Sequence, residues 1–237
     1  MDEYGATRDT MYRTQSALSS KVFMAKVYGW MTVALLITAL VAMYVAGSEQ
    51  LMNSIVRNHG LLIGLFIGEL ALVWILSASI NRLSFPVAAT MFVVYSALNG
   101  LTISFIFLLY TSVSITSTFF ITAGTFGAMS FYGYTTKKDL SSWGSLLLMA
   151  LIGLIIASVV NLFMASSMLY WITTYAGVLI FVGLTAYDTQ KIKNMGVGDA
   201  ESYSDVGKKM AVLGALSLYL DFINLCLFLL RIFGRRR

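Results

Sequence analysis

The sequence predicts an all-α integral membrane protein with seven transmembrane helices. Three observations lead to this fold class: 58% of the residues are hydrophobic, only 11% are charged, and the mean hydropathy is +0.80. A bilayer core about 30 Å thick needs roughly 20 apolar residues for each helix that crosses it. The chain supplies seven such runs, at 27–46, 60–80, 87–110, 114–134, 143–164, 168–188 and 211–233. Because the connections are short, we expect one transmembrane domain over residues 27–233.

The two ends of the chain differ from the apolar runs. Residues 1–26 are polar and carry both signs of charge, and residues 234–237 form a basic tail. The first apolar run is too long for the core of a signal peptide and lacks a convincing cleavage site, so we expect residues 1–26 to be retained. Cys226 is the only cysteine, which excludes an intramolecular disulfide and a cysteine-based metal site.

The basic residues predict how the chain is oriented. Most of them fall in the segments that a seven-span chain places on the side of its amino terminus, whereas the loops on the other side carry only Arg57. The positive-inside rule therefore predicts a cytosolic amino terminus for residues 1–26. The basic tail would then lie outside, so either it tolerates translocation or the last segment does not cross fully. The net charge of +5 does not predict nucleic-acid binding, because the basic residues are scattered among loops.

The connections between the apolar runs carry their own signals. Residues 47–59 and 191–209 are expected to be soluble segments. Within the second of them, Gly196 and Gly198 mark the expected end of the sixth helix. The only proline, Pro86, suits the first turn of the third helix, which follows a tight connection.

Small residues recur on one face of the second span, where Gly60, Gly64 and Gly68 are spaced four apart. Such residues allow helix backbones to approach closely. We expect ordinary helix contacts inside the bundle, with a homodimer seam as the alternative, so the oligomeric state stays open.

Three carboxylates lie within or at the end of apolar runs. An ionisable side chain inside a transmembrane helix costs on the order of 3 kcal/mol or more, so each is a functional-site hypothesis. Asp221 sits in the middle of Leu213–Phe233 with only neutral polar neighbours, and Asp188 ends the sixth run, where a plain interfacial carboxylate is the alternative. Glu69 falls near the bilayer midplane and either makes an interhelical hydrogen bond or belongs to an ion or proton path.

Asp188 and Asp221 can meet if their depths in the antiparallel sixth and seventh spans agree. Two carboxylates in an apolar site do not both ionise easily, so such a pair would share one proton and titrate with two macroscopic pKa values. This arrangement predicts a pH sensor. Its oxygens are hard ligands that suit cations such as calcium, so the same two residues are expected to contact a permeating cation transiently.

Enzyme function is not predicted. The sequence has no zincin motif, no Gly-x-Ser-x-Gly, no nucleotide-binding loop and only one histidine, His59. Carboxylates at membrane depth without a catalytic partner favour the movement of protons or cations instead. We therefore expect no tightly bound cofactor, with membrane lipid, protons and calcium ions as partners.

Two segments around the aspartates form recognisable motifs, Gly183-Leu-Thr-Ala-Tyr-Asp-Thr-Gln-Lys-Ile192 and Ser217-Leu-Tyr-Leu-Asp-Phe-Ile-Asn-Leu225. They resemble the signatures of the Bax inhibitor-1 (transmembrane Bax-inhibitor motif) family. The likeness extends through Lys137-Lys-Asp-Leu140 and the seven-span layout over about residues 20–235, and it is greatest to the bacterial inner-membrane members.

The resemblance implies a last helix surrounded by the six others in two three-helix layers, and a pH-sensitive calcium leak through the membrane. Carried over by position, Asp188 and Asp221 are the family's proton-sharing aspartate pair, and Glu69 lines the pore. Some bacterial members have an arginine latch eleven residues after that glutamate, but here the position is Ile80. Arg82 is the nearest candidate, and two helical positions turn a side chain by about 200°, so its role as a latch is in doubt.

Two other functions remain open. The protein can instead regulate a membrane protease or the stress and cell-death machinery through residues 1–26 or 191–209, with the aspartates serving stability. It can also be a proton-coupled transporter of a small solute, which would show saturable transport driven by a proton gradient.

Overall fold

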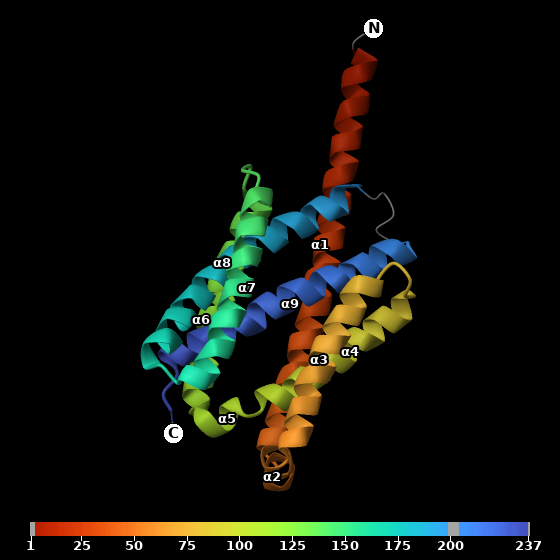
Figure 1. Cartoon of the computed structure of the whole chain (residues 1–237). Helices are drawn as coiled ribbons and strands as arrows, with labels where there is room; N and C mark the ends of the chain where they lie inside the picture. Colours follow the sequence, from red (N-terminus) through yellow and green to blue (C-terminus); the bar gives the residue numbers. More distant parts are fainter. Residues whose placement is uncertain (1–2, 199–203, 237) are drawn as a thin grey trace. The chain divides into compact units, whose positions relative to one another are not determined.

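The computed structural model describes residues 3–198 and 204–236, and the side chains of residues 18–196 and 204–236. Throughout these ranges the backbone is helical or in turns, apart from a single bridge pairing of Tyr110 with Arg236. The helices are α1 (Glu3–Ala46), α2 (Glu49–Arg57), α3 (His59–Ser79), α4 (Phe85–Ile103), α5 (Ile106–Leu109), α6 (Ser112–Thr135), α7 (Ser141–Met164), α8 (Ser167–Gly198) and α9 (Asp205–Phe233) (Figure 1).

Six stretches of the described helices are long and apolar enough to cross a membrane. These candidate spans are Leu18–Ala46, His59–Ser79, Phe85–Leu109, Ser141–Met164, Ser167–Gly196 and Asp205–Phe233. The all-α membrane class is thereby confirmed, but seven spans are not. The expected span at 114–134 falls in α6, which is 24 residues long and rich in serine and threonine, and the hydroxyl groups lower its hydropathy.

The connections are more helical than the sequence predicted. The solvated loop expected over 191–209 is wrong at both ends, because α8 continues to Gly198 and α9 begins at Asp205. Gly196 does not end the helix; a Cβ atom there would lie 2.9 Å from Phe23 of α1, so the glycine permits close packing. Residues 199–203, in the middle of the expected loop, lie outside the described residues.

The soluble segment expected at 47–59 is also mostly helix. It contains α2, which buries Met52 and Ile55 in a cluster with Val45 and Leu65. Residue 26, the expected boundary of the amino-terminal segment, lies inside the continuous helix α1. Composition changes at that point, but the hydrogen-bonded helix does not end there.

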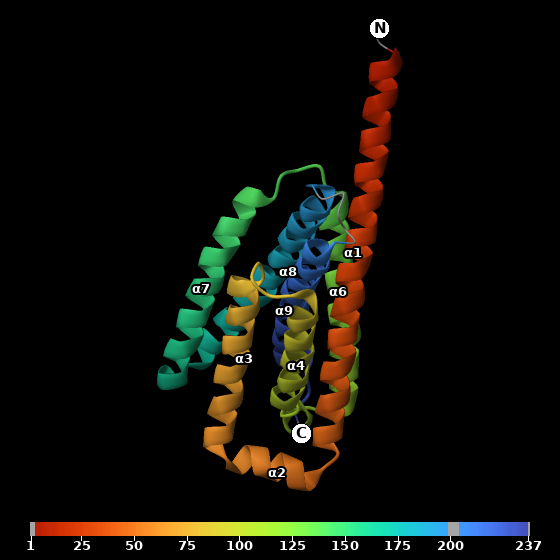
Figure 2. The same ribbon diagram turned by 90° about the vertical axis from the view of Figure 1, so that its right-hand side faces the viewer.

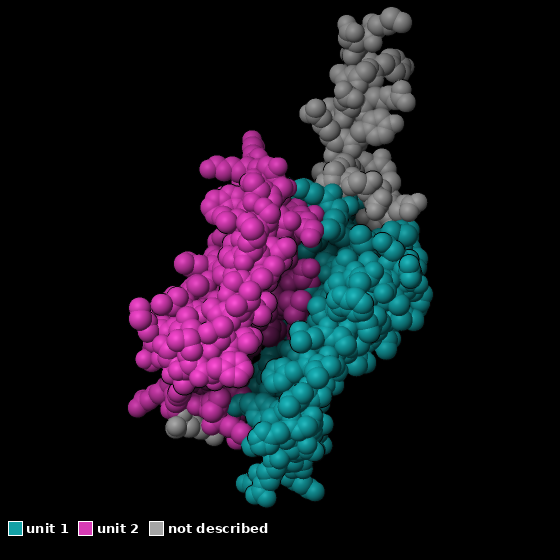
Figure 3. Space-filling view, viewed as in Figure 1, with its two compact units in different colours: residues 1–105, 192–216 teal, residues 106–191, 217–237 magenta. Residues whose placement is uncertain are grey.

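The chain divides into two compact units, which Figure 3 colours teal and magenta. The first unit comprises residues 1–105 and 192–216. In it α4 packs against both α1 and α3, and α2 crosses between the ends of α1 and α3 (Figure 2). A Cβ atom at Gly100 would lie 2.7 Å from the carbonyl oxygen of Thr38, so this glycine allows α1 and α4 to touch. Pro86 lies in the first turn of α4, as predicted.

The second unit comprises residues 106–191 and 217–237, so α8 and α9 each contribute to both units. Its helices also touch through glycines. A Cβ atom at Gly133 of α6 would overlap the backbone of Ala186 in α8, and one at Gly177 of α8 would lie 2.6 Å from the ring of Phe228 in α9. These contacts hold α6 and α9 close to α8.

The glycine stripe of the second span behaves differently. A Cβ atom at Gly64 or Gly68 would meet no described atom within 4 Å. The intramolecular helix contact expected at these two positions is therefore absent from the described structure.

Candidate functional site

Asp221 is the most deeply buried carboxylate of the second unit. Its side chain is 4% exposed, and its Oδ2 atom has no hydrogen-bond partner in the described part of the chain. Asn224, a neutral polar residue three positions further along α9, donates its Nδ2 hydrogen to the carbonyl oxygen of Leu220 at 2.8 Å. An unpaired polar atom at this depth is rare in folded proteins and calls for an explanation.

Asp188 lies on α8 in the same unit and is half-buried. Its charge acts on Asp221 across the contact between α8 and α9, and the nearby Lys191 acts on Asp188 in turn. The two predicted aspartates therefore lie close enough to interact electrostatically. Their role as a proton-sensitive pair remains a prediction.

The surroundings of Asp221 are aromatic on the side of α6. The ring of Phe222 packs edge to face against Phe119 and Phe126, with centroids 5.5 Å and 5.4 Å away. Leu218, Tyr219 and Leu225 on α9 have no exposed surface at all. This packing keeps water away from the carboxylate and makes its unpaired oxygen more costly.

Gln190 is a residue that the sequence analysis missed, although it belongs to the segment around Asp188. Its side-chain amide donates to the carbonyl oxygen of Lys138 at 2.8 Å, and its Oε1 accepts from the N–H of Leu140 at 2.8 Å. Together these bonds tie the loop between α6 and α7 to the helix that carries Asp188. The neighbouring Thr189 donates to the hydroxyl of Ser130 on α6 at 3.3 Å.

The same loop carries an exposed carboxylate, Asp139. The N–H of Ser141, at the start of α7, donates to its Oδ1 atom at 2.8 Å, and hydrogen bonding by Ser141 lowers the pKa of this carboxyl below its usual value. Asp139 therefore stays ionised at neutral pH and offers a solvated comparison for the buried carboxylates.

Glu69 belongs to the first unit and is 8% exposed. Its Oε2 atom accepts a hydrogen bond from the side-chain amide of Asn99 at 3.2 Å, and its Oε1 accepts a short one from the hydroxyl of Thr102. Both partners lie on α4, so Glu69 joins α3 to α4 with two bonds where the sequence analysis considered one. The spacing of three between Asn99 and Thr102 places them on one helix face but does not show which helix that face meets.

Arg82, the candidate latch, lies in the turn between α3 and α4 in the first unit. Its side chain is exposed, and its backbone N–H donates to the carbonyl oxygen of Ser79 at 2.8 Å. The neighbouring Ile80, where the resemblance would place an arginine, is buried. The latch remains a prediction.

Clusters of potential metal ligands are absent from the described side chains. No three or more His, Cys, Asp and Glu side chains come together within residues 18–196 and 204–236. An ion passing the aspartates would find two carboxylates and the surrounding backbone as oxygen ligands.

The helices and their buried carboxylates define a multi-helix membrane protein. A family model described as the inhibitor of apoptosis-promoting Bax1 matches residues 20–237. The chain belongs to this Bax inhibitor-1 family, which confirms the resemblance seen in the two signature segments.

Bacterial relatives align over almost the whole chain. The inner membrane protein YbhL of Escherichia coli K12 is 56% identical over 97% of both chains. An uncharacterized protein of Borreliella burgdorferi is 44% identical over 97% of this chain and 98% of its own length. An uncharacterized protein of Rickettsia prowazekii is 43% identical, with coverage of 91% and 90%.

Proposed function

We propose that the protein is a pH-sensitive passive leak for calcium or other cations, gated by Asp188 and Asp221. The observation that carries this proposal is the buried carboxylate of Asp221, which has an unpartnered oxygen and a second carboxylate acting on it. Such an oxygen is stabilised when it gains a proton or a cation, so the site exchanges one for the other as pH changes. There is no catalytic step, and no cofactor is needed.

The membrane topology is part of the proposal. We place α6 across the membrane as the expected fourth span, which makes seven spans in all, and we place the amino terminus in the cytosol and the chain in the bacterial inner membrane, as for YbhL. The hydroxyl groups of Thr122, Thr125 and Thr135 donate back to carbonyl oxygens of their own helix, which suits a helix in lipid. α9 has the largest buried share of the candidate spans, 56%, which supports a last helix enclosed by two layers.

Opening would follow from a change in the bonds of the pair. Protonation removes the mutual repulsion of the two carboxylates and supplies a donor that α8 or α9 can use. A shift of either helix would then open or close a path for the ion. Glu69 would line this path, and Arg82 is the residue to test as a latch.

The test is calcium flux into liposomes that contain the purified full-length protein, scanned from about pH 6 to about pH 8. Parent protein should give flux above empty liposomes and a clear dependence on pH. Asp188→Asn and Asp221→Asn should each remove that dependence. Asp139→Asn is the matched control, because it makes the same chemical change at a solvated carboxylate and should leave the pH profile as in the parent.

Three outcomes would contradict the proposal. An unaltered pH profile in folded Asp221→Asn would remove the gate, and absence of flux from folded parent protein would favour the regulatory role through residues 1–26 or 191–209. Saturable uptake of a small solute driven by a proton gradient would favour a transporter.

A further inference from the structure

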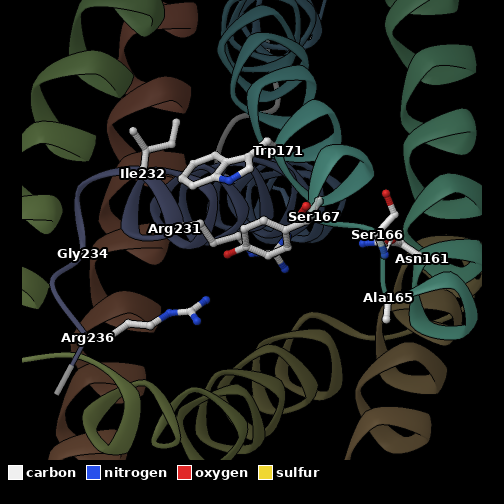
Figure 4. A pocket seen from close by; sticks show the side chains of 10 residues that line it. Asn161, Ala165, Ser166, Ser167, Trp171, Arg231, Ile232, Gly234 and Arg236 are labelled. Atoms are coloured by element: carbon white, nitrogen blue, oxygen red, sulfur yellow. Dashed lines mark hydrogen bonds between the residues drawn. The ribbon is translucent and has the colours of Figure 1, made fainter.

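A cavity of about 590 Å³ opens at one end of the second unit, where α7 ends, α8 begins and α9 ends (Figure 4). Two of its lining residues are arginines, Arg231 and Arg236, and none of its ten lining residues is acidic. In Figure 4 the Arg236 side chain extends from the carboxyl-terminal tail into this space. The lining therefore combines two positive charges without a carboxylate.

Aromatic neighbours hold both guanidinium groups in place. The guanidinium of Arg231 lies over the rings of Tyr170 and Phe228, at 5.5 Å and 5.0 Å from their centroids. The side chain of Arg236 donates hydrogen bonds to the hydroxyls of Tyr110 and Tyr170, which raise its pKa. Both charges are thus oriented before any ligand arrives, which reduces the entropy lost on binding.

The tail that carries Arg236 is fastened to the start of α6. The N–H of Thr111 donates to the carbonyl oxygen of Arg235 at 3.1 Å, and the N–H of Arg235 donates to the hydroxyl of Ser114 at 3.0 Å. The isolated bridge between Tyr110 and Arg236 continues this pairing. The positive charge of the tail is therefore kept at the end of the helices.

The level of the cavity suits a lipid headgroup. It lies where the candidate spans in α7 and α9 end, and Tyr170 and Trp171 line it, as aromatic residues commonly do at the membrane–water boundary. Beside it, the outer surfaces of α7 and α8 are apolar and could contact acyl chains. Exposed side chains there are Leu162, Phe163, Met164, Met168, Tyr175 and Leu179.

We propose that this cavity binds the phosphate of an anionic phospholipid, with Arg231 and Arg236 donating hydrogen bonds to its oxygens. The guanidinium group matches the geometry of phosphate, and arginine is therefore a common residue at sites that recognise phosphate. The adjoining apolar surface favours a phospholipid over free phosphate, because only the lipid can also bury its chains there.

The test is lipid binding to the full-length protein in detergent, measured by native mass spectrometry with phosphatidylglycerol and with phosphatidylcholine. The parent should retain phosphatidylglycerol preferentially. Arg231→Gln and Arg236→Gln should each lower its retention by about tenfold, the effect of losing one charge-assisted hydrogen bond. Arg235→Gln is the matched control, since it removes the same charge from the same tail but does not line the cavity.

The proposal is overturned if Arg235→Gln lowers retention as much as the two cavity variants, or if phosphatidylcholine is retained equally. Inorganic phosphate is added as a competitor. Displacement of phosphatidylglycerol by equimolar phosphate would show that the cavity binds free phosphate and not a lipid. Since Arg231 packs on two rings, its variant must first match the parent in melting temperature. Arg236, whose side chain is exposed, provides the test that does not depend on that packing.

Discussion

Glu69 in the first unit and Asp221 in the second are both carboxylates buried in apolar helices, but their oxygens differ in hydrogen bonding. Glu69 accepts bonds from Asn99 and Thr102, one on each oxygen. Asp221 keeps Oδ2 unpartnered and faces the charge of Asp188. The difference teaches that burial alone does not identify a functional carboxylate. Glu69 makes hydrogen bonds that stabilise the contact between two helices. Burial of the Asp221 carboxylate lowers the stability of the fold, because no hydrogen bond to Oδ2 offsets the loss of hydration.

The largest effect is expected from breaking the close contact between α6 and α8 in the second unit, the unit that holds Asp221. Gly133→Ala places a methyl group on the backbone of Ala186, where no side chain can move aside. We expect a loss of about 3 kcal/mol in the free energy of unfolding, measured in mixed micelles. Gly127→Ala on the same helix is the control, because its methyl group meets no described atom within 4 Å. Equal stability of the two variants would show that the contact between α6 and α8 is not tight.

The next effect separates the two carboxylates directly. Glu69→Leu removes the hydrogen bonds from Asn99 and Thr102 to the carboxylate, so unfolding should become easier by about 1–2 kcal/mol. Glu69→Gln keeps one acceptor oxygen and should lose less. A Glu69→Leu variant as stable as the parent would mean that these two hydrogen bonds do not stabilise the contact between α3 and α4.

Asp221→Asn should change stability by less than about 1 kcal/mol, because the oxygen that it replaces has no partner to lose. Its effect should appear in the pH profile of calcium flux instead. Unfolding and calcium flux measured on the same preparation distinguish an effect on stability from an effect on the pH profile. A large loss of stability together with an unchanged flux profile would show that Asp221, like Glu69, stabilises the packing of the helices and does not set the pH dependence.

The smallest effect is expected at Asp139, the solvated carboxylate. Hydrogen bonding by Ser141 places its folded-state pKa below the unfolded value, so the stabilisation is present above the unfolded pKa and is lost as pH falls through the folded one. Asp139→Asn should remove this contribution, so parent and variant should differ in stability at neutral pH and become alike in acid. Melting temperatures of parent and variant between about pH 3 and about pH 7 measure it. A difference that persists only in acid would contradict the sign.

Much of the fold could be predicted, but not the connections. Some apolar runs lie within helices whose ends are close to the predicted ones, as at His59–Ser79 and Ser141–Met164, because apolar length is a local property. The run at 87–110 is instead divided between α4 and α5. The continuation of α8 to Gly198 could not be predicted from the sequence around Gly196. Glycine usually ends a helix, but here Gly196 accommodates Phe23, which is distant in sequence.

The candidate site divides in the same way. Asp221 was evident as an isolated charge in an apolar run, and its family motif pointed to Asp188. Gln190, Asn99 and Thr102 were not found, since neutral polar side chains in a membrane helix give no sign of which helix they face. Arg231 and Arg236 were seen only as part of a basic tail, and the cavity that they line required the tail to fold back onto α6.

The sequence by itself determined that this protein is helical, lies in a membrane, belongs to the Bax inhibitor-1 family and carries charges where lipid would exclude them. These properties depend on composition and local pattern, which packing does not alter. Only the tertiary structure decided that Glu69 is satisfied, that Oδ2 of Asp221 is not, and that two arginines share a cavity. Such pairings depend on how neighbouring helices are rotated and how closely their backbones approach, and glycine contacts between distant residues set both.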